Sequence, residues 1–349
     1  MFKNCFLNSI AAVIVAAGIG SNAFAQGGFD GPSDGPTAAA DKTIVVLAAD
    51  LKNGGILGVT NGVEEAAKKV GWTVRVLDGG GSVQGRTAAF GQAMALQPDG
   101  IIINGFDAVE QQAALDQVAD AGIPMVSWHS GPKIGCDAPG GIFANVSTDA
   151  MTVSEEAAKW AINDAGGEPG VVIFTDSTYQ IAIDKADRIK ETIESMGGKV
   201  LEYVDTPIAD TSNRMGPLTT SLLQKYGSDW THALAINDIY FDFMGPALAA
   251  AGIKGDGSPK AVAAGDGSES AFQRIKTGQY QSITVAEPLN LQGWQLVDEM
   301  NRAIQGQDCS GYVTSPAVVD TDGAVAMGDS PIFDPDNGYR EAYAKIWGL

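Results

Sequence analysis

The stretch GIIINGFDAVEQQAALDQVADAGIPMVSW, residues 100–128, changes its hydrophobic pattern twice. Its two ends, 100–104 and 124–128, are short apolar runs typical of buried strands, and the segment between them, 108–122, has the pattern of a helix. Two such strands joined by a helix favour a parallel βαβ unit, in which helices cover the faces of the sheet. The stretch therefore predicts an α/β fold.

The same alternation extends in both directions and forms two successive series of strands and helices. Two doubly wound units of similar size predict two Rossmann-like lobes, each with a parallel sheet, and a cleft between them. The chain of 349 residues also exceeds the size at which a single hydrophobic core usually stops growing. The first series has strands at 43–50, 73–78, 100–104 and 124–128 and ends at 142–147; the second has strands at 170–176, 199–205, 232–238, 261–266 and 282–287.

The N-terminus has the features of an export signal. Residues 1–25 contain an apolar stretch at 10–19 and end in the small-x-small sequence AFA at 23–25, as a cleaved secretory signal peptide does. Residues 26–41 are rich in Gly, Pro and Asp and have little apolar surface to pack, which predicts a flexible leader. We expect the mature protein to begin at Gln26 and to be located in the periplasm.

Charge and cysteine content narrow the partners and the redox setting. The chain has 22 basic and 42 acidic residues and a net charge of −20, which argues against nucleic acid or anionic lipid as partners. Cys5 lies in the signal, so Cys136 and Cys309 remain after cleavage. In an oxidising compartment they either form a disulfide or stay as two unrelated thiols.

Signatures of enzyme chemistry are sparse. The sequence has no GxxxxGK[ST] phosphate loop, no HExxH and no CxxC pair, and the glycine-rich segment 78–86 matches a dinucleotide-binding turn only loosely. With His129 and His232 as its two histidines, the chain cannot form a histidine metal cluster. A Ser-His-Asp triad that uses His129 stays open, but nothing marks its nucleophile. We expect no enzymatic activity, no cofactor and no catalytic metal.

Polar residues follow most of the predicted strands at their carboxyl ends. In open parallel sheets, ligands bind outside the carboxyl ends of the strands, so these residues are candidates for a binding site. Any one of them can instead be a helix cap or a turn residue. The set comprises Asp50, Asn104, His129, Asp176, Asn237, Asp266 and Glu287.

Four short sequence segments resemble those of a known protein family. They are GIPMVSW at 122–128, AIND at 235–238, AAGDGS at 263–268 and ITVAEP at 283–288. With the export signal and the two αβ series, they resemble the type I periplasmic sugar-binding proteins of ABC transporters, the group that includes the ribose-, xylose- and galactose-binding proteins. The resemblance covers residues 43–322. LacI-type repressors share this fold, but they begin with a DNA-binding helix-turn-helix, where this chain has a signal peptide.

The resemblance implies two lobes joined by a three-crossover hinge, with the ligand held between them. Closure of the lobes would signal to the membrane subunits of an ABC permease, and the protein would act as a monomer. The tail 333–349 is interpreted as a strand extension and a packing helix. The implied crossovers lie near 145–149, 287–289 and 312–318, the N-terminal lobe comprises 42–147 plus 289–316, and the C-terminal lobe comprises 148–287 plus 317–349.

The resemblance also implies individual ligand-binding residues. Asn237 matches the Asn of AIND, and its amide can donate to and accept from adjacent hydroxyls. Asp266 matches the Asp of GDG, and its carboxylate can accept from two hydroxyl donors. Glu287 stands where ribose-type relatives usually have Gln, so this position gains a charge. Lys185 falls about where the family often has an Arg.

Residues 128–130 depart from the family pattern. His129 and Ser130 stand where ribose-type proteins have an Asp-Arg pair, and we expect His129 to act as a hydrogen-bonding clamp instead. Trp128 either supplies an apolar platform for a sugar face or points into the core of the N-terminal lobe, because strand alternation gives residue 128 the opposite face from 127 and 129. Three further candidates are Tyr240, Tyr179 and Asp50, of which Tyr240 can also be core and Asp50 an ordinary loop residue.

The acidic residues at the expected site constrain the ligand. Asp266 and Glu287 converge, and buried carboxylates without partners are unfavourable, so the ligand must bring several donors or a positive charge. A monosaccharide, sugar alcohol or cyclitol fits the first case and an amino sugar the second; a metal ion in the acidic cleft also stays open. We expect a substrate-binding protein of an ABC importer that closes on a hinge. The alternatives are a ligand sensor for a chemoreceptor or histidine kinase, and a periplasmic sugar-processing enzyme.

Overall fold

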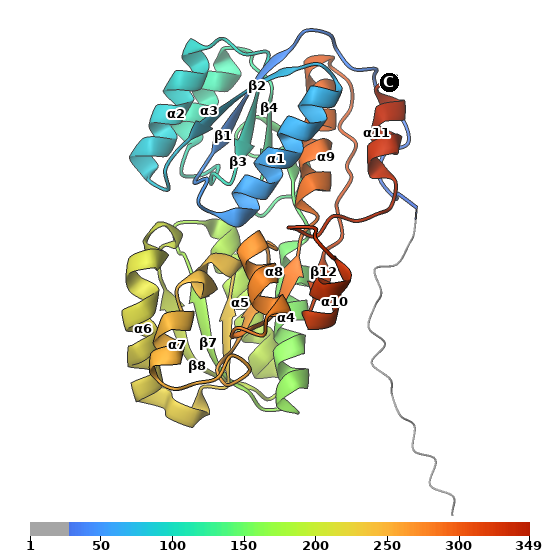
Figure 1. Ribbon diagram of the computed structural model, residues 1–349. Helices are drawn as coiled ribbons and strands as arrows, with labels where there is room; N and C mark the ends of the chain where they lie inside the picture. Colours follow the sequence, from blue (N-terminus) through green and yellow to red (C-terminus); the bar gives the residue numbers. More distant parts are fainter. Residues whose placement is uncertain (1–27) are drawn as a thin grey trace, which may run out of the picture.

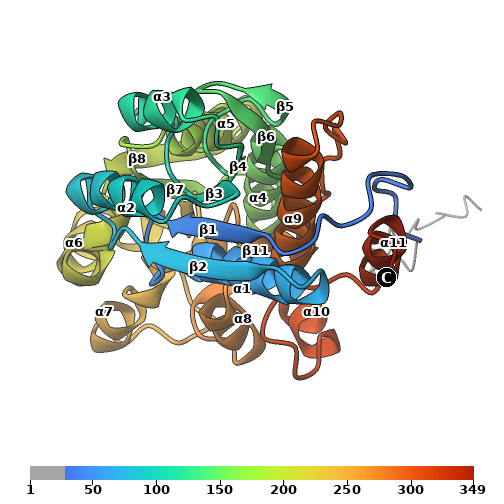
Figure 2. The same ribbon diagram turned by 90° about the horizontal axis from the view of Figure 1, so that it is seen from above.

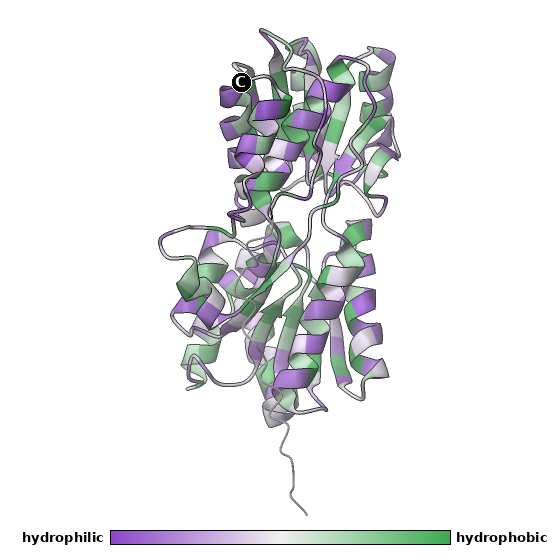
Figure 3. Ribbon diagram, turned by 90° about the vertical axis from the view of Figure 1, so that its right-hand side faces the viewer, coloured by the Kyte–Doolittle hydropathy of each residue, from purple (hydrophilic) through white to green (hydrophobic). Residues whose placement is uncertain are grey.

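The computed structural model describes residues 28–349 as two α/β lobes stacked one above the other (Figure 1). The predicted signal peptide, 1–25, lies outside the described residues. Apolar residues concentrate on the strands and on the helix faces that turn toward them (Figure 3). Among residues 28–349, none of the helices combines the length and the apolar character needed to span a bilayer.

The N-terminal lobe is built on a six-stranded sheet with the order β2-β1-β3-β4-β6-β5. Its strands are parallel except β5, which pairs antiparallel with β6. All residues of β3 are buried, as expected for a strand that helices cover on both faces. The strands are β1 (Thr43–Ala48), β2 (Thr73–Asp78), β3 (Gly100–Asn104), β4 (Met125–Trp128), β5 (Gly135–Ala138) and β6 (Ile142–Val146). The helices are α1 (Gly54–Lys69), α2 (Val83–Ala95), α3 (Gln112–Asp120) and α9 (Leu289–Ile304), with α1 and α9 packed together on one face of the sheet (Figure 2).

The C-terminal lobe repeats this plan with the strand order β12-β11-β10-β9-β7-β8, in which β12 pairs antiparallel with β11. The other strands of this sheet are parallel. The strands are β7 (Gly170–Thr175), β8 (Lys199–Asp205), β9 (His232–Ala235), β10 (Lys260–Ala263), β11 (Gln281–Ala286) and β12 (Ala317–Val319). The helices are α4 (Ala150–Ala165), α5 (Gln180–Ser195), α6 (Thr211–Tyr226), α7 (Gly245–Ala250), α8 (Glu269–Lys276) and α10 (Thr321–Ala326).

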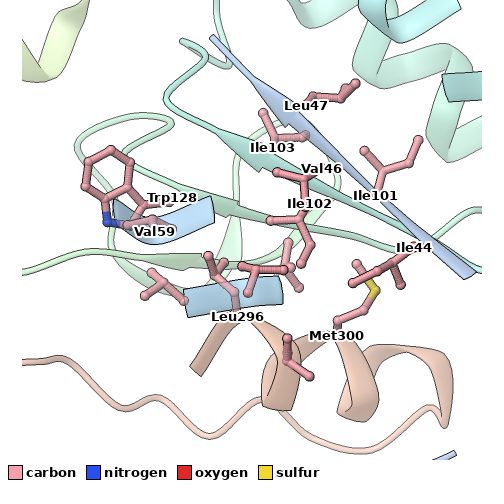
Figure 4. Packing of buried hydrophobic residues seen from close by; sticks show 14 of the residues in the cluster. Ile44, Val46, Leu47, Val59, Ile101, Ile102, Ile103, Trp128, Leu296 and Met300 are labelled. Carbon is pink, nitrogen blue, oxygen red and sulfur yellow. The ribbon is translucent and has the colours of Figure 1, made fainter. Parts of the chain in front are cut away.

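The chain passes between the lobes after β6, after β11 and before β12. The predicted fold class, two Rossmann-like lobes joined by three crossovers, is confirmed. Although α9 follows a strand of the C-terminal sheet, it completes the core of the N-terminal lobe. Its Leu296 and Met300 lie beside Ile44 and Ile102 (Figure 4).

The C-terminal tail makes a fourth passage that we did not expect. We placed residues 317–349 in the C-terminal lobe, but α11 (Tyr339–Ile346) returns to the N-terminal lobe and packs beside α9 (Figure 1). The reason is an aromatic face: Trp347 stacks on Trp294 of α9 with ring centroids 5.4 Å apart, and Tyr343 stacks on Trp347. Residues 339–349 therefore belong to the N-terminal lobe and not, as predicted, to the C-terminal lobe.

The segment before β1 is also held more firmly than its composition suggested. We expected a flexible leader at 26–41, whereas the described part, from residue 28, runs along the N-terminal lobe. Ala38 donates its backbone N–H to the carbonyl of Trp347, and Ala39 donates its own to Asn301. In both contacts the segment contributes a backbone N–H, which composition does not reveal, and Phe29 adds ring contacts with Tyr312 and Tyr343.

Cys136 and Cys309 form a disulfide, with their Cα atoms 5.8 Å apart. The bond connects β5, at the edge of the N-terminal sheet, to the segment that follows α9. Of the two alternatives left open by the sequence, the structure therefore contains the paired one.

Candidate functional site

A cavity of about 160 Å³ lies between the lobes, at the carboxyl ends of strands from both sheets. It is smaller than the 300–1,000 Å³ of typical drug-sized pockets, so it suits a molecule about the size of one sugar ring. The switch from strand to loop places the polar side chains here, as expected for open parallel sheets. The polar lining residues are Asp50, Asn53, Arg86 and His129 from the N-terminal lobe and Asp176, Thr178, Tyr179, Lys185, Asn237 and Asp266 from the C-terminal lobe.

Seven of the nine residues that we singled out line this cavity. They are Asn237, Asp266, His129, Lys185, Trp128, Tyr179 and Asp50. Glu287 lies directly behind the wall, against His129 and Lys185. Tyr240 lies elsewhere: its ring stacks on Phe174 in the core of the C-terminal lobe, and its hydroxyl donates to the carbonyl of Thr206.

The carboxylate of Asp266 is a buried polar group of the cavity without a hydrogen-bond donor. It is 6% exposed, and it accepts no hydrogen bond from any residue between 28 and 349. Gly55, in the first turn of α1, approaches it so closely that a side chain at position 55 would collide with the carboxylate. Burial raises the pKa of Asp266 to about 8; Lys185 opposes this rise, and the neighbouring Glu287 and Asp238 add to it. Asp266 therefore holds a proton near neutral pH until a donor approaches.

This pKa predicts how stability depends on pH. The folded chain binds the Asp266 proton more tightly than the unfolded chain does, since the pKa falls from about 8 to the ordinary 3.8 on unfolding. The contribution of Asp266 to the free energy of unfolding therefore decreases as the pH rises through this window, by at most about 1.4 kcal/mol per pH unit. Asparagine cannot titrate, so the stability of Asp266→Asn relative to the wild type should increase between about pH 5 and pH 8. Urea unfolding at several pH values checks this, and parallel pH profiles of the two proteins would contradict the raised pKa.

Glu287 connects both lobes at the hinge. Its Oε2 accepts hydrogen bonds from His129 Nε2 at 3.0 Å, from Gln292 Nε2 at 3.1 Å and from the backbone N–H of Thr148 at 3.4 Å. The ammonium of Lys185 lies 3.7 Å from its Oε1. Burial opposes ionisation, but His129 and Lys185 outweigh it and hold the pKa of Glu287 below its usual range. Glu287 is thus an ionised group that positions its neighbours, and it does not itself face the cavity.

Trp128 combines the two roles that the sequence left open for it. Trp128 is 2% exposed and belongs to the core of the N-terminal lobe, yet it also lines the cavity. Its ring stacks on His129 with centroids 3.6 Å apart. Strand alternation predicted opposite directions for the two rings, but His129 has a φ of 53°, which ends the strand pattern at this point.

His129 acts as a hydrogen-bond donor toward Glu287. Burial lowers the pKa of His129, and Glu287 opposes this effect. The ring is then neutral and gives its Nε2–H to the ionised carboxylate, which leaves Nδ1 as an acceptor. Asn237 is also buried in the site, and its Oδ1 has no hydrogen-bond partner among the described residues. These atoms and Asp266 are available to a ligand.

Arg86 is a lining residue that we did not predict. It ends the glycine-rich segment 78–86 and lies in the first turn of α2, and the sequence pattern of this segment pointed to a loose nucleotide-binding turn rather than to a cleft side chain. Its guanidinium binds Glu110 and donates to the hydroxyl of Tyr179 in the other lobe at 3.1 Å. Asp107 likewise reaches across and accepts from the backbone N–H of Gln180, at the start of α5. The two lobes are therefore in contact at the mouth of the cavity.

Three residues could contribute to a metal site, because His129, Asp266 and Glu287 offer ligand atoms within 4.8 Å of one another. Lys185 argues against a cation there. Its ammonium donates to the carbonyl of Ala264 at 3.0 Å and already supplies a positive charge beside Glu287. A metal ion would be repelled by this ammonium at close range.

Two α/β lobes that enclose a small polar cavity between them are the architecture of a ligand-binding protein. The chain belongs to the family of the periplasmic binding protein domain, whose model matches residues 44–308. The family is one of periplasmic ligand-binding proteins. The fourth passage between the lobes and α11 lie outside the matched residues.

Solved structures share this fold at low sequence identity. An ABC transporter solute-binding protein from Agrobacterium vitis with bound allitol is 19% identical, with a TM-score of 0.70 over 82% of this chain and 98% of that chain. A second protein from A. vitis, bound with alpha-D-tagatopyranose, is 19% identical with a TM-score of 0.71 over 83% and 97%. The arabinose-transporter component from Shewanella sp. ANA-3, bound to L-arabinofuranose, is 17% identical with a TM-score of 0.72 over 87% and 98%. No curated protein sequence matches this chain.

Proposed function

We propose that this protein is the substrate-binding component of an ABC importer. It captures a monosaccharide, sugar alcohol or cyclitol between its lobes in the periplasm and delivers it, as a monomer, to the membrane subunits of a permease. The observation that carries the proposal is a cavity of about 160 Å³ to which both lobes contribute. Among the described residues, the carboxylate of Asp266 and the Oδ1 of Asn237 line this cavity without a hydrogen-bond partner. Solved proteins of the same fold hold allitol, tagatopyranose and arabinofuranose.

The chemistry of the site supports a ligand with several hydroxyl donors. A hydroxyl donates one hydrogen bond and accepts others, so adjacent hydroxyls can pair with Asp266 and with the amide of Asn237 together. As the ligand hydroxyls approach, Asp266 releases its proton to the solvent, and the resulting carboxylate accepts the stronger charge-assisted bond. The ligand binds the open form through one lobe, and contacts from the second lobe shift the population toward the closed form.

A thermal-shift screen of the mature protein tests the proposal. The panel contains pentoses, hexoses, polyols, cyclitols, amino sugars and amino acids. A ligand at about a hundred times its dissociation constant should stabilise the fold by roughly 2.7 kcal/mol, which is a readily visible shift. A hit among neutral sugars or polyols supports the proposal. Hits among amines alone would make Asp266 part of a cation site and favour an amino sugar, and no hit at all would contradict a sugar-binding role.

A further inference from the structure

Helix α5 begins at the mouth of the cavity, and its own flanking residues provide no side-chain cap. The first N–H groups of a helix have no acceptor inside the helix. Tyr179, the residue before α5, does not cap it with its side chain, and the first turn contains no acidic residue. The same end of α5 contributes Ile181, Ala182 and Lys185 to the cavity wall. The start of this helix therefore depends on an acceptor from another part of the chain.

The acceptor is supplied by the other lobe. Asp107 lies between β3 and α3 of the N-terminal lobe, and its Oδ2 accepts from the backbone N–H of Gln180, the first residue of α5, at 3.0 Å. Its Oδ1 stays within its own turn and accepts from the N–H groups of Val109 and Glu110 at 2.8 and 3.1 Å. Asp107 is 5% exposed and is not among the residues that line the cavity. Its carboxylate therefore joins the lobes at the positive end of a helix, away from the ligand.

A second contact joins the same parts of the two lobes. Glu110, in the turn that begins at Asp107, accepts from the guanidinium of Arg86 through both of its oxygens. Arg86 is 2% exposed and donates across the lobe boundary to the hydroxyl of Tyr179. Both contacts are lost when the lobes separate, because the donor and the acceptor belong to different lobes. The start of α5 is therefore held to the N-terminal lobe by two hydrogen bonds.

We propose that Asp107 is a latch for the closed form: it caps α5 only when the lobes are closed, and it thereby raises the affinity for a ligand that it does not contact. A bond that is present in one form and absent from the other shifts the population toward the form that has it. A ligand binds more tightly when the form competent to bind it is more populated. The latch is a property of the two lobes, and only its effect on affinity rests on the proposed function.

Asp107→Asn separates the latch from the local turn. Asparagine keeps an Oδ1 for its own turn, but its NH₂ group replaces Oδ2 and faces the N–H of Gln180, so two donors meet. The ratio of closed to open molecules should fall about fivefold, as is typical for the loss of a helix cap. The matched control is Asp320→Asn, because Asp320 caps α10 through the N–H of Gly323 within one lobe. It should leave both the lobe equilibrium and the affinity unchanged.

Distances between spin labels measure the latch in the mature protein without a ligand. Gln92→Cys on α2 and Gln224→Cys on α6 provide exposed labelling positions in different lobes, on the side of the molecule opposite α10 (Figure 1). The two native cysteines form a disulfide and do not take up the label. Opening lengthens the distance between the labels. The share of long distances should therefore be larger in Asp107→Asn than in the wild type and in Asp320→Asn.

Calorimetric titration with the pentoses, hexoses, polyols and cyclitols of the panel measures the effect on affinity. If the free protein is mainly open, the dissociation constant of each sugar that binds should rise about fivefold in Asp107→Asn. If the free protein is mainly closed, the change should appear in the label distances instead. One of the two measurements therefore responds to the latch in either case, and thermal unfolding shows that each variant is folded.

The outcomes for the latch and for the proposed function can be told apart. Unchanged label distances together with unchanged dissociation constants in Asp107→Asn overturn the latch and leave the proposed function standing. An equal response in Asp320→Asn also overturns it, since the effect would then follow from the loss of any cap. Absence of binding by every sugar and polyol overturns the proposed function, and the label distances then decide the latch alone: identical distances in Asp107→Asn and the wild type overturn it.

Discussion

Asp266→Ala should weaken binding of the best ligand from the screen by at least a hundredfold. The carboxylate is buried, lines the cavity and accepts no hydrogen bond from residues 28–349. We therefore expect a bound ligand to supply its hydrogen-bond donors. Hydrogen bonds to a charged group contribute about 1.5–3 kcal/mol each, and two of them account for the expected loss. Alanine would also leave the ligand hydroxyls buried without acceptors.

Calorimetric titration measures this loss, with two variants as controls. Asp266→Asn keeps one acceptor and should lie between the wild type and Asp266→Ala, because it removes the charge but not the shape. Asp256→Ala removes an exposed carboxylate of the same lobe and should bind like the wild type. Thermal unfolding confirms that each variant is folded. Binding by Asp266→Ala within tenfold of the wild type would mean that the site lies elsewhere.

The candidate site could be predicted in large part because it depends on topology. Parallel strands end at one edge of a sheet, so residues such as Asp50, Asn237 and Asp266 could be grouped before their positions were known. The resemblance to sugar-binding proteins then selected Asn237 and Asp266 from this group. The two-lobe fold followed from the alternating hydrophobic periods alone.

Other positions depend on details that a pattern does not contain. The positive φ of His129 breaks strand alternation, which no periodicity reveals. Tyr240 follows Asn237 closely, but a short 3-10 turn directs its ring into the core. Arg86 reaches the cavity through its pairing with Glu110, a contact between α2 and the loop before α3.

The two ends of the chain show a second limit of sequence reasoning. The segment before β1 and helix α11 support each other through Ala38 and Trp347, which are more than 300 residues apart in sequence. The contacts that attach each segment to the lobe join residues far apart in the sequence, so local sequence patterns did not predict them. Only the three-dimensional structure shows that both segments pack against α9.

The second large effect concerns the hinge, where Glu287→Ala should lower the free energy of unfolding by about 3–5 kcal/mol. Removing one partner of a buried ion pair is strongly destabilising because it leaves the other charge, here Lys185, without compensation. Glu287 also joins the three crossovers. It lies on the second crossover, after β11, and accepts a hydrogen bond from the backbone N–H of Thr148 on the first. Gln292 donates both to Glu287 and to Thr314 on the third crossover. Its loss therefore affects all three of these crossovers, although not the fourth passage, which leads to α11.

Urea unfolding of three variants separates the charge from the hydrogen bonds. Glu287→Gln, the residue usual at this position in ribose-type relatives, keeps the shape and an acceptor for His129, so it should lose less stability than Glu287→Ala. Glu168→Ala removes an exposed carboxylate before β7 and should change stability by no more than about 0.5 kcal/mol. If Glu287→Ala lost less than about 1 kcal/mol, Lys185 would have to find another partner, and the hinge would not depend on this carboxylate. A large loss in Glu287→Ala with a small one in Glu287→Gln would instead assign the stabilisation to the hydrogen bonds at the crossovers, because the glutamine retains them while lacking the charge.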